Sequence, residues 1–124
     1  MSQSATVLLL NDRGKLLAVS RGDDATNWGM PGGWVERGES PAQGAARELW
    51  EETGIRVSPE HLEPVYQQGD CTTFVPRGPM HVPPVLYSEP FEGYVAWLDP
   101  SAIACETCTF GRTNAKMLRD LGLL

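Results

Sequence analysis

The chain has 124 residues, of which 41% are hydrophobic and 21% are charged. This is the composition of an ordinary globular domain, and it excludes a disordered, collagen-like or coiled-coil protein. No apolar run approaches the roughly 18 residues that a membrane span requires, so we expect no contact with a membrane.

The formal net charge of −6 disfavours a protein that coats nucleic acid. An acidic protein can still bind phosphate groups, but it then needs metal cations or a local basic cluster. Cys71, Cys105 and Cys108 are few and odd in number, which predicts reduced thiols in a cytoplasmic protein. Cys105 and Cys108 form a single CxxC pair, so structural zinc and redox use remain alternatives. The apolar stretch 5–10 has no basic residues before it, and we expect no signal peptide.

The first predicted elements are strands. The apolar runs 5–10 and 15–21 flank the turn residues Asn11, Asp12 and Gly14, and this pattern predicts a β-hairpin. The polar residues 22–27 predict a loop. Residues 28–35 mix tryptophan, glycine and proline, which predicts a strand edge that bends where the backbone closely approaches another group.

Ser40 and Pro41 open the clearest helix in the sequence. Serine is a favourable N-cap, and proline suits the first helical position. Residues 42–52 are mostly strong helix formers, and Gly54 is placed to end the helix.

Further strands are predicted at 62–67, 72–75, 82–87 and 93–98, and a terminal helix at 113–121. Prolines between 76 and 90 indicate loops, bulges or edge strands in that region. The order of strands, helix, strands and helix predicts an α/β or α+β sandwich around a mixed β-sheet, in a single domain that covers residues 1–124.

An acidic cluster lies on the predicted helix. Glu48, Glu51 and Glu52 have i, i+3 and i+4 spacing and share one helix face. Their charges repel unless something offsets them, and hard divalent cations prefer carboxylate oxygens as ligands. A solvated acidic helix face is the alternative. Glu39 and Arg47 favour the metal site, because arginine can neutralise and orient a carboxylate.

Residues 33–55 resemble the signature of the Nudix hydrolase family, Gly-x5-Glu-x7-Arg-Glu-U-x-Glu-Glu-x-Gly-U, where U is aliphatic. The residues that match it are Gly33, Glu39, Arg47, Glu48, Leu49, Glu51, Glu52, Gly54 and Ile55. The preceding segment 28–33 also looks like the family's entry into its signature loop. The resemblance implies a Nudix-type α/β/α sandwich around a mixed sheet. It also implies hydrolysis of a nucleoside diphosphate linked to another moiety, with Mg²⁺ or, as a substitute, Mn²⁺.

Metal ligands are carried over from the resemblance by position. They are Glu48, Glu51 and Glu52, together with the backbone carbonyl oxygen of Gly32. The family's metal screens phosphate charge and lowers the pKa of a bound water molecule.

The remaining catalytic roles follow in the same way. Glu39 would support the metal or its waters, and Arg47 would orient the glutamates by ion pairing. Glu52 is the leading candidate for the base that deprotonates water. Some family members use a glutamate from a loop outside the signature, and here Glu92 is preferred over Glu89.

The predictions of substrate-binding residues rest on weaker sequence signals. Trp28 and Tyr94 could stack on a base, and Arg21 could meet phosphate. The family branch that destroys oxidised dGTP reads the purine with an asparagine near the start of the terminal helix, where this chain has Asn114. The alternatives are core packing for the aromatic residues, plain surface charge for Arg21 and a helix cap for Asn114.

The leading prediction is Mg²⁺-dependent hydrolysis of a (d)NTP to a (d)NMP and pyrophosphate. ADP-ribose, dinucleoside polyphosphates and nucleotide sugars are alternative substrates. A non-catalytic nucleotide-binding module is the alternative from another class, although such modules typically lose signature glutamates. We expect a small-molecule nucleotide as the partner, no stable complex with nucleic acid, and a monomer or a homodimer.

Overall fold

The computed structural model describes residues 2–86 and 93–124 of the chain. The helices and strands in these residues are β1 Ser4–Val7, β2 Leu16–Arg21, β3 Asp24–Gly29, β4 Gly32–Trp34, α1 Pro41–Thr53, β5 Arg56–Val57, η1 Pro59–His61, β6 Leu62–Gln68, β7 Cys71–Pro76, β8 Met80–His81, β9 Val95–Leu98, η2 Pro100–Ile103 and α2 Gly111–Asp120.

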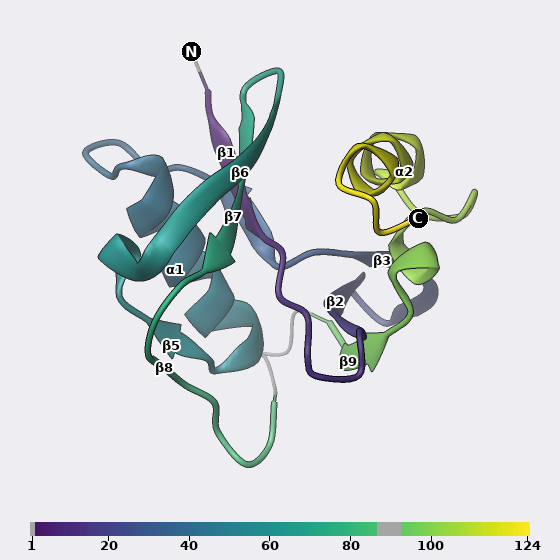
Figure 1. Ribbon diagram of the computed structural model, residues 1–124, viewed down its shortest axis with the longest axis horizontal. Coiled ribbons are helices and arrows are strands. Elements are labelled where there is room, and N and C mark those ends of the chain that lie inside the picture. Colours follow the sequence, from purple (N-terminus) through teal and green to yellow (C-terminus); the bar gives the residue numbers. More distant parts are fainter. Residues whose placement is uncertain (1, 87–92) are drawn as a thin grey trace.

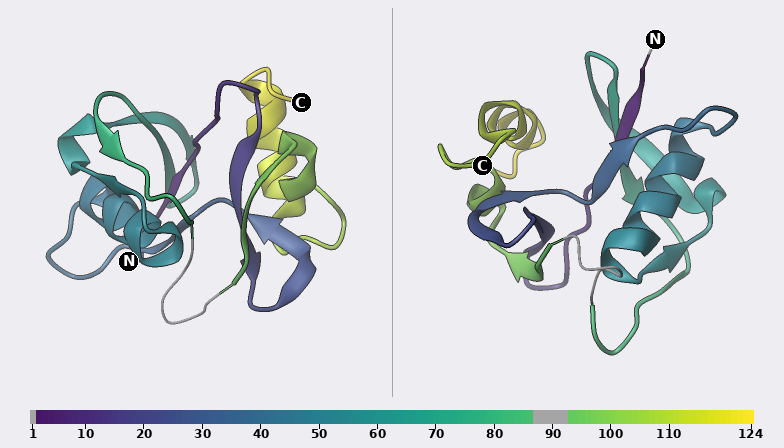
Figure 2. Two further views of the ribbon diagram at one scale, coloured as in Figure 1. Left: turned by 90° about the horizontal axis from the view of Figure 1, so that it is seen from below. Right: turned by 180° about the vertical axis from the view of Figure 1, so that it is seen from behind.

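Two sheets lie between the two α-helices (Figure 1). The larger sheet is mixed, with strand order β4-β1-β7-β6, and β1 pairs antiparallel with β4 and parallel with β7. The smaller sheet has the order β3-β2-β9, and a further pair joins β5 to β8. Helix α1 covers the larger sheet, and α2 lies on the opposite side of the molecule beside the smaller sheet (Figure 2). The predicted α+β sandwich with a mixed sheet is confirmed.

Helix α1 begins and ends where the sequence predicts. The Ser40 side chain accepts a hydrogen bond from the Gln43 backbone N–H, and the Gln43 side chain accepts one from the Ser40 N–H. This reciprocal pair satisfies two amide donors that the first helical turn leaves unpaired. Gly54 ends the helix with φ of 83°, a left-handed conformation that glycine adopts without steric cost.

Two apolar clusters form the core. One lies between α1 and the larger sheet and includes Val7, Leu49 and Phe74. The other lies between α2 and the smaller sheet and includes Leu16 and Leu118. Each helix is therefore fixed by its own set of buried side chains.

The prediction of a hairpin between 5–10 and 15–21 is confirmed beside the turn but is wrong along the rest of the two runs. The turn itself is confirmed, since Gly14 N–H donates to the Asn11 carbonyl at 3.1 Å. Beyond it, Leu10 and Leu16 form an antiparallel bridge, and the Leu17 N–H donates to the Leu9 carbonyl at 2.9 Å. Strand β1, however, pairs with β4 and β7 and not with β2. The apolar run serves both cores, because Leu9 packs in one cluster and Leu8 in the other. The chain thus crosses from one sheet to the other within this run.

Two other expectations need correction. Residues 22–27 contain most of β3, which pairs with β2 at an edge of the smaller sheet, so its polar side chains can remain exposed. Residues 82–86 form no strand, and pairing stops at β8, just before Pro83 and Pro84. Proline lacks the N–H that a sheet ladder requires. Tyr87, the last residue of that predicted strand, lies outside the described residues.

Candidate active site

Arg47 is the centre of a glutamate cluster, which we define as Glu39, Glu48, Glu51 and Glu52. Its Nε and Nη2 atoms donate to the two carboxylate oxygens of Glu39, at 2.8 and 3.1 Å. Its Nη1 atom donates to Glu48 at 3.0 Å and to Glu51 at 3.2 Å. One guanidinium therefore joins three of the four glutamates, and the fork of N–H donors sets their positions.

The loop before α1 completes the arginine's surroundings. Arg47 Nη2 also donates to the backbone carbonyl of Trp34 at 3.1 Å, and Glu36 lies 3.6 Å from Nη1. The Glu39 carboxylate in turn accepts the Glu36 N–H at 2.9 Å. The hydrogen bond from Arg47 lowers the pKa of Glu39, and the pKa of Arg47 is raised by the same pairing. Loop and helix are thus tied together through the ion pair between Arg47 and Glu39.

Glu48 packs directly against β4. A Cβ atom added to Gly33 would lie 2.7 Å from Glu48 Oε1, a distance that only the absence of a side chain permits. Burial raises the pKa of Glu48, and the nearby Glu51 charge adds to the rise, while Arg47 opposes it. Negative charge is therefore crowded here, in a place where a cation would be favoured.

Glu52 reaches the strand that carries Gly32. Its Oε2 atom accepts the Gly32 N–H at 2.9 Å. A Cβ on Gly32 would lie 2.4 Å from the Ala5 carbonyl, so the backbone of β4 runs too close to β1 for any side chain. The two adjacent glycines of β4 thus let helix α1 and strand β1 approach the same short segment.

The oxygen ligands available at this site fit a hard divalent cation, because the carboxylates on one turn of α1 lie beside the backbone of β4. Within residues 2–86 and 93–124, no three acidic, imidazole or thiol groups are already gathered around a single point. Arg47 binds oxygens of Glu48 and Glu51, and Gly32 binds an oxygen of Glu52. In this arrangement, Glu48 and Glu51 therefore face Arg47, and Glu52 faces the Gly32 backbone.

Comparison with known proteins decides the family. The family model described as the NUDIX domain matches residues 2–119. The chain belongs to the Nudix family. The arginine-centred glutamate cluster is thus the signature segment of a Nudix domain, folded as helix α1 and the loop before it.

Individual relatives agree with this assignment. The chain is 47% identical over 66 residues to a MutT-like protein of Streptomyces ambofaciens, an alignment that covers 53% of this chain and 42% of that protein. It is 46% identical over 65 residues to an RNA pyrophosphohydrolase of Roseobacter denitrificans, covering 52% and 39%. The aligned part spans about two fifths of each of these relatives. The crystal structure of MutT from Methanosarcina mazei is 27% identical, with a TM-score of 0.64 over 95% of this chain and 93% of that chain.

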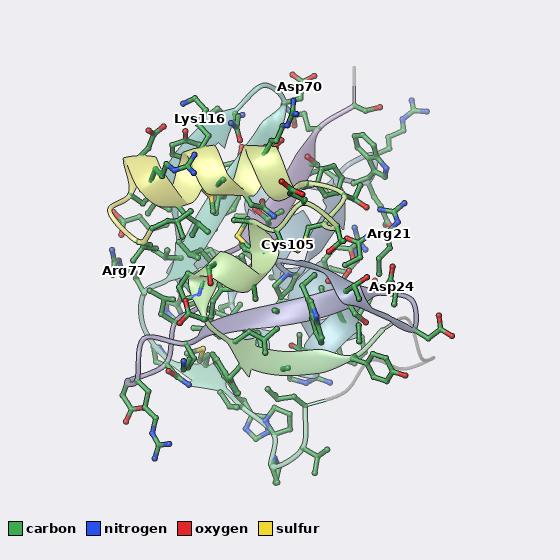
Figure 3. All side chains as sticks on the ribbon, turned by 90° about the vertical axis from the view of Figure 1, so that its right-hand side faces the viewer. Arg21, Asp24, Asp70, Arg77, Cys105 and Lys116 are labelled. Atoms are coloured by element: carbon green, nitrogen blue, oxygen red, sulfur yellow. A yellow bond between two sulfur atoms is a disulfide. The ribbon has the colours of Figure 1, made fainter. Side chains whose placement is uncertain are left out.

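Three of the predicted substrate residues gather at one end of the smaller sheet. Ser20 pairs with Trp28 on one side, and its N–H donates to the Tyr94 carbonyl on the other. Arg21 follows Ser20 and is exposed, as is Tyr94 (46%), and Figure 3 shows Arg21 beside Asp24 at this end of the sheet. Trp28 is half-buried and packs against the second core cluster. Core packing, the alternative prediction for Trp28, therefore describes part of its role.

Asn114 lies apart from these residues. It is 6% exposed, and its side-chain amide donates to the Ile103 carbonyl at 3.0 Å. The alternative prediction that it caps the helix is wrong, because Phe110 is the N-cap and no side chain caps this end. The observed contact joins α2 to η2. Glu89 and Glu92 lie outside the described residues.

The expectation of reduced thiols needs correction. Cys105 and Cys108 form a disulfide, and Cys71 is free. No zinc-type group of cysteine and histidine ligands occurs among the residues that the structure describes. No helix in that part of the chain is long and apolar enough to cross a membrane.

Two site features could not be anticipated from the sequence. One is the Trp34 carbonyl that binds Arg47, and the other is the contact between Gly33 and Glu48. A backbone acceptor carries no residue-type signal, so nothing pointed to the first. For the second, Gly33 opens the signature, but the signature does not say which side chain requires the missing Cβ.

Proposed function

We propose that this Nudix domain is a divalent-metal-dependent pyrophosphohydrolase that converts a (d)NTP to a (d)NMP and pyrophosphate. The observation that carries the proposal is the glutamate cluster, in which Arg47 contacts three glutamates of the full family signature. A retained set of acidic side chains, of which Glu48 is half-buried against β4, supports an enzyme over a module that only binds nucleotide.

In this proposal, the side chains of the glutamate cluster and Arg47 have separate roles. Glu48, Glu51 and Glu52 would hold Mg²⁺ together with the Gly32 carbonyl, while Arg47 and Glu39 position them. When bound, Mg²⁺ supplies charge neutralisation for the diphosphate and acidifies a water molecule. Glu52 would accept the proton of the attacking water, and its contact with the Gly32 N–H supports a fixed orientation beside β4.

The substrate lies, in this proposal, against the end of the smaller sheet. The exposed ring of Tyr94 would stack on the base, and Arg21 would meet phosphate. Trp28 would contribute the edge of its half-buried ring. Asn114 can read a base only if its amide leaves the Ile103 carbonyl, so it is the least supported of the four.

The proton acceptor has a second candidate in Glu92. The pH dependence of kcat separates the two, because loss of the general base removes the limb of the profile that the base controls. Glu52→Gln and Glu92→Gln are therefore compared at saturating Mg²⁺ over a range of pH.

A panel of substrates tests the proposal. The protein is incubated with dNTPs, 8-oxo-dGTP, ADP-ribose, a dinucleoside polyphosphate and a nucleotide sugar, each with Mg²⁺, Mn²⁺ or chelator. We expect pyrophosphate from the triphosphates, and no product with chelator. Release of AMP and a sugar phosphate from ADP-ribose instead would move the assignment to that substrate class.

One substitution separates catalysis from binding. Glu52→Gln should lower kcat by about 10²-fold or more, as expected for a group that moves a proton. Glu106→Gln, a change at an exposed glutamate outside the cluster, serves as the matched control. A Glu52→Gln rate within about threefold of the parent would remove Glu52 from its role. Nucleotide binding with no turnover of any substrate by the parent protein would instead support the non-catalytic module.

A further inference from the structure

A disulfide lies on the side of the molecule away from α1. Cys105 and Cys108 lie between η2 and α2, and Figure 3 shows Cys105 below helix α2. Cys108 is 7% exposed, whereas Cys105 is partly accessible. The two cysteines of one disulfide therefore differ in their access to solvent.

The disulfide opens onto a pocket. The pocket has a volume of about 780 Å³ and is lined by both cysteines, by Thr109, and by the charged residues Glu106, Arg112 and Arg119. Two cations and one anion give this wall a positive charge, although the whole chain carries −6. A small anionic molecule is thus favoured here over a cationic one.

We propose that Cys105–Cys108 is a thiol–disulfide exchange site whose substrate is a small thiol that carries a carboxylate group. The partial exposure of Cys105, the charged pocket and the hydrogen-bonding surroundings together support this assignment. The site lies outside the glutamate cluster, and the proposal does not depend on the hydrolytic activity.

The exchange has a defined order. The thiolate of the small thiol attacks Sγ of Cys105, the more exposed cysteine; a bond forms between these two sulfurs, and Cys108 leaves as a thiolate. A second molecule of the thiol then attacks the sulfur of the first and releases Cys105. The two small thiols lose two protons and two electrons and become a symmetric disulfide, and the two cysteines gain them.

The surroundings offer hydrogen-bond partners to the reduced cysteines. The Trp28 N–H lies 3.4 Å from Cys108 Sγ, where it donates and would stabilise a departing thiolate. The Ala102 carbonyl lies 3.2 Å from the same sulfur, and the Thr26 carbonyl lies 3.7 Å from Cys105 Sγ. A disulfide has no S–H to donate, so these carbonyls acquire thiol partners only after reduction.

The loop is also held by contacts that do not involve sulfur. The Asn27 side chain donates to Thr109 Oγ1 at 2.8 Å and accepts the Thr109 N–H at 2.8 Å. A disulfide across three positions of the chain removes little entropy from the unfolded state. The bond can therefore open without loss of the fold, as an exchange site requires.

Mass spectrometry after alkylation tests the order of attack in a Cys71→Ser background. Cys108→Ser should accumulate one glutathione on Cys105 when incubated with oxidised glutathione. Cys105→Ser should accumulate it on Cys108 at least about tenfold more slowly, because that sulfur is buried. Equal rates for the two variants would overturn the proposal, as would two unpaired thiols in the protein after oxidation in air. Circular dichroism of both variants shows whether the fold is retained.

Charge provides the second test. The disulfide is reduced with glutathione, neutral 2-mercaptoethanol or cationic cysteamine, in the parent and in Arg112→Gln/Arg119→Gln. The double variant should slow the reaction with glutathione about threefold, leave that with 2-mercaptoethanol unchanged and speed that with cysteamine. Arg13→Gln, outside the pocket, is the control. If the ratio of the double variant's rate to the parent's rate were the same for all three thiols, a site selective for anionic thiols would be excluded.

Discussion

The α1 side and the α2 side of the molecule both bury apolar clusters, but their polar groups differ in kind. On the α1 side, Arg47 and its partners lie within a short stretch of sequence, and their contacts are ionic. On the α2 side there is one ion pair within the helix, between Lys116 and Asp120, but the contacts that hold the segments together join distant positions, such as Asn27 and Thr109, 82 positions apart. Spacing along a helix encodes the first arrangement directly, whereas the second exists only after the sheet and α2 have come together.

The largest expected effects come from the two cores. Leu49 and Leu118 are both fully buried, one in each cluster, and form a matched pair. We expect Leu49→Ala and Leu118→Ala each to lower the free energy of unfolding by about 2–5 kcal/mol, measured by denaturant titration. A single transition with an unchanged m-value in both variants supports our proposal of one domain. Separate transitions would mean that the two sides unfold independently.

Measurements of kcat should distinguish the Leu49→Ala variant from the Leu118→Ala variant. Leu49 follows Glu48 on α1, so its truncation should disturb the glutamate cluster and lower kcat. Leu118 lies on the other helix, and its truncation should leave kcat close to the parent value at temperatures well below the melting transition. Equal losses of kcat would show that the site depends on both sides of the molecule.

Arg47→Lys tests whether the cluster needs the shape of the arginine or only its charge. Lysine keeps the charge but cannot bind Glu39, Glu48 and Glu51 through a planar fork. We expect kcat or the apparent affinity for Mg²⁺ to fall by about 10–100-fold, as for other residues that orient metal ligands. Kinetics at several Mg²⁺ concentrations distinguishes a change in kcat from a change in the apparent affinity for Mg²⁺. Arg13→Lys is the control, and an unchanged Arg47→Lys enzyme would contradict the positioning role.

Gly33→Ala asks how closely β4 must approach the helix. The added Cβ would lie 2.7 Å from Glu48 Oε1, so the carboxylate must move. We expect kcat to fall about tenfold, because small displacements of reacting groups are costly, while the fold persists. Gly29→Ala on β3, the strand that precedes β4 in the sequence, meets nothing within 4 Å and serves as the control. Parent-like rates in Gly33→Ala would show that Glu48 has room to adjust.

These contrasts explain what the sequence could predict. The bounds of α1 follow from Ser40, Pro41 and Gly54, and the cluster follows from the spacing of its glutamates, all of which are local signals. The path of residues 5–21 could not be predicted, since a turn and two apolar runs fit both a hairpin and a crossing between sheets. The strand character of residues 24–27 was hidden because a polar edge strand shows no alternation of apolar residues.

Asn114 illustrates the same limit at the level of one side chain. Its position near the start of α2 predicted a base-reading residue by family resemblance or a cap by residue type, and neither interpretation considered the segment packed against the helix. The Ile103 carbonyl that it binds comes from η2, a short element that the sequence pattern does not predict. A polar residue near a helix end can thus be assigned only when the segment packed against that end is known.

The smallest expected effect lies on the α2 surface. Asp120 accepts hydrogen bonds from Lys116 at 2.7 Å and from the Tyr66 hydroxyl, which ties α2 to β6. Lys116 and Tyr66 lower the pKa of Asp120 below its ordinary value of 3.8. The stabilisation is therefore present above that value and is lost as the pH falls through the folded-state pKa. Asp120→Asn should lower the melting temperature slightly at neutral pH, with Asp70→Asn as an exposed control. The difference from the parent should shrink in acid below pH 3.8. A difference that stayed constant into acid would mean that the carboxylate charge contributes nothing to holding α2 against β6.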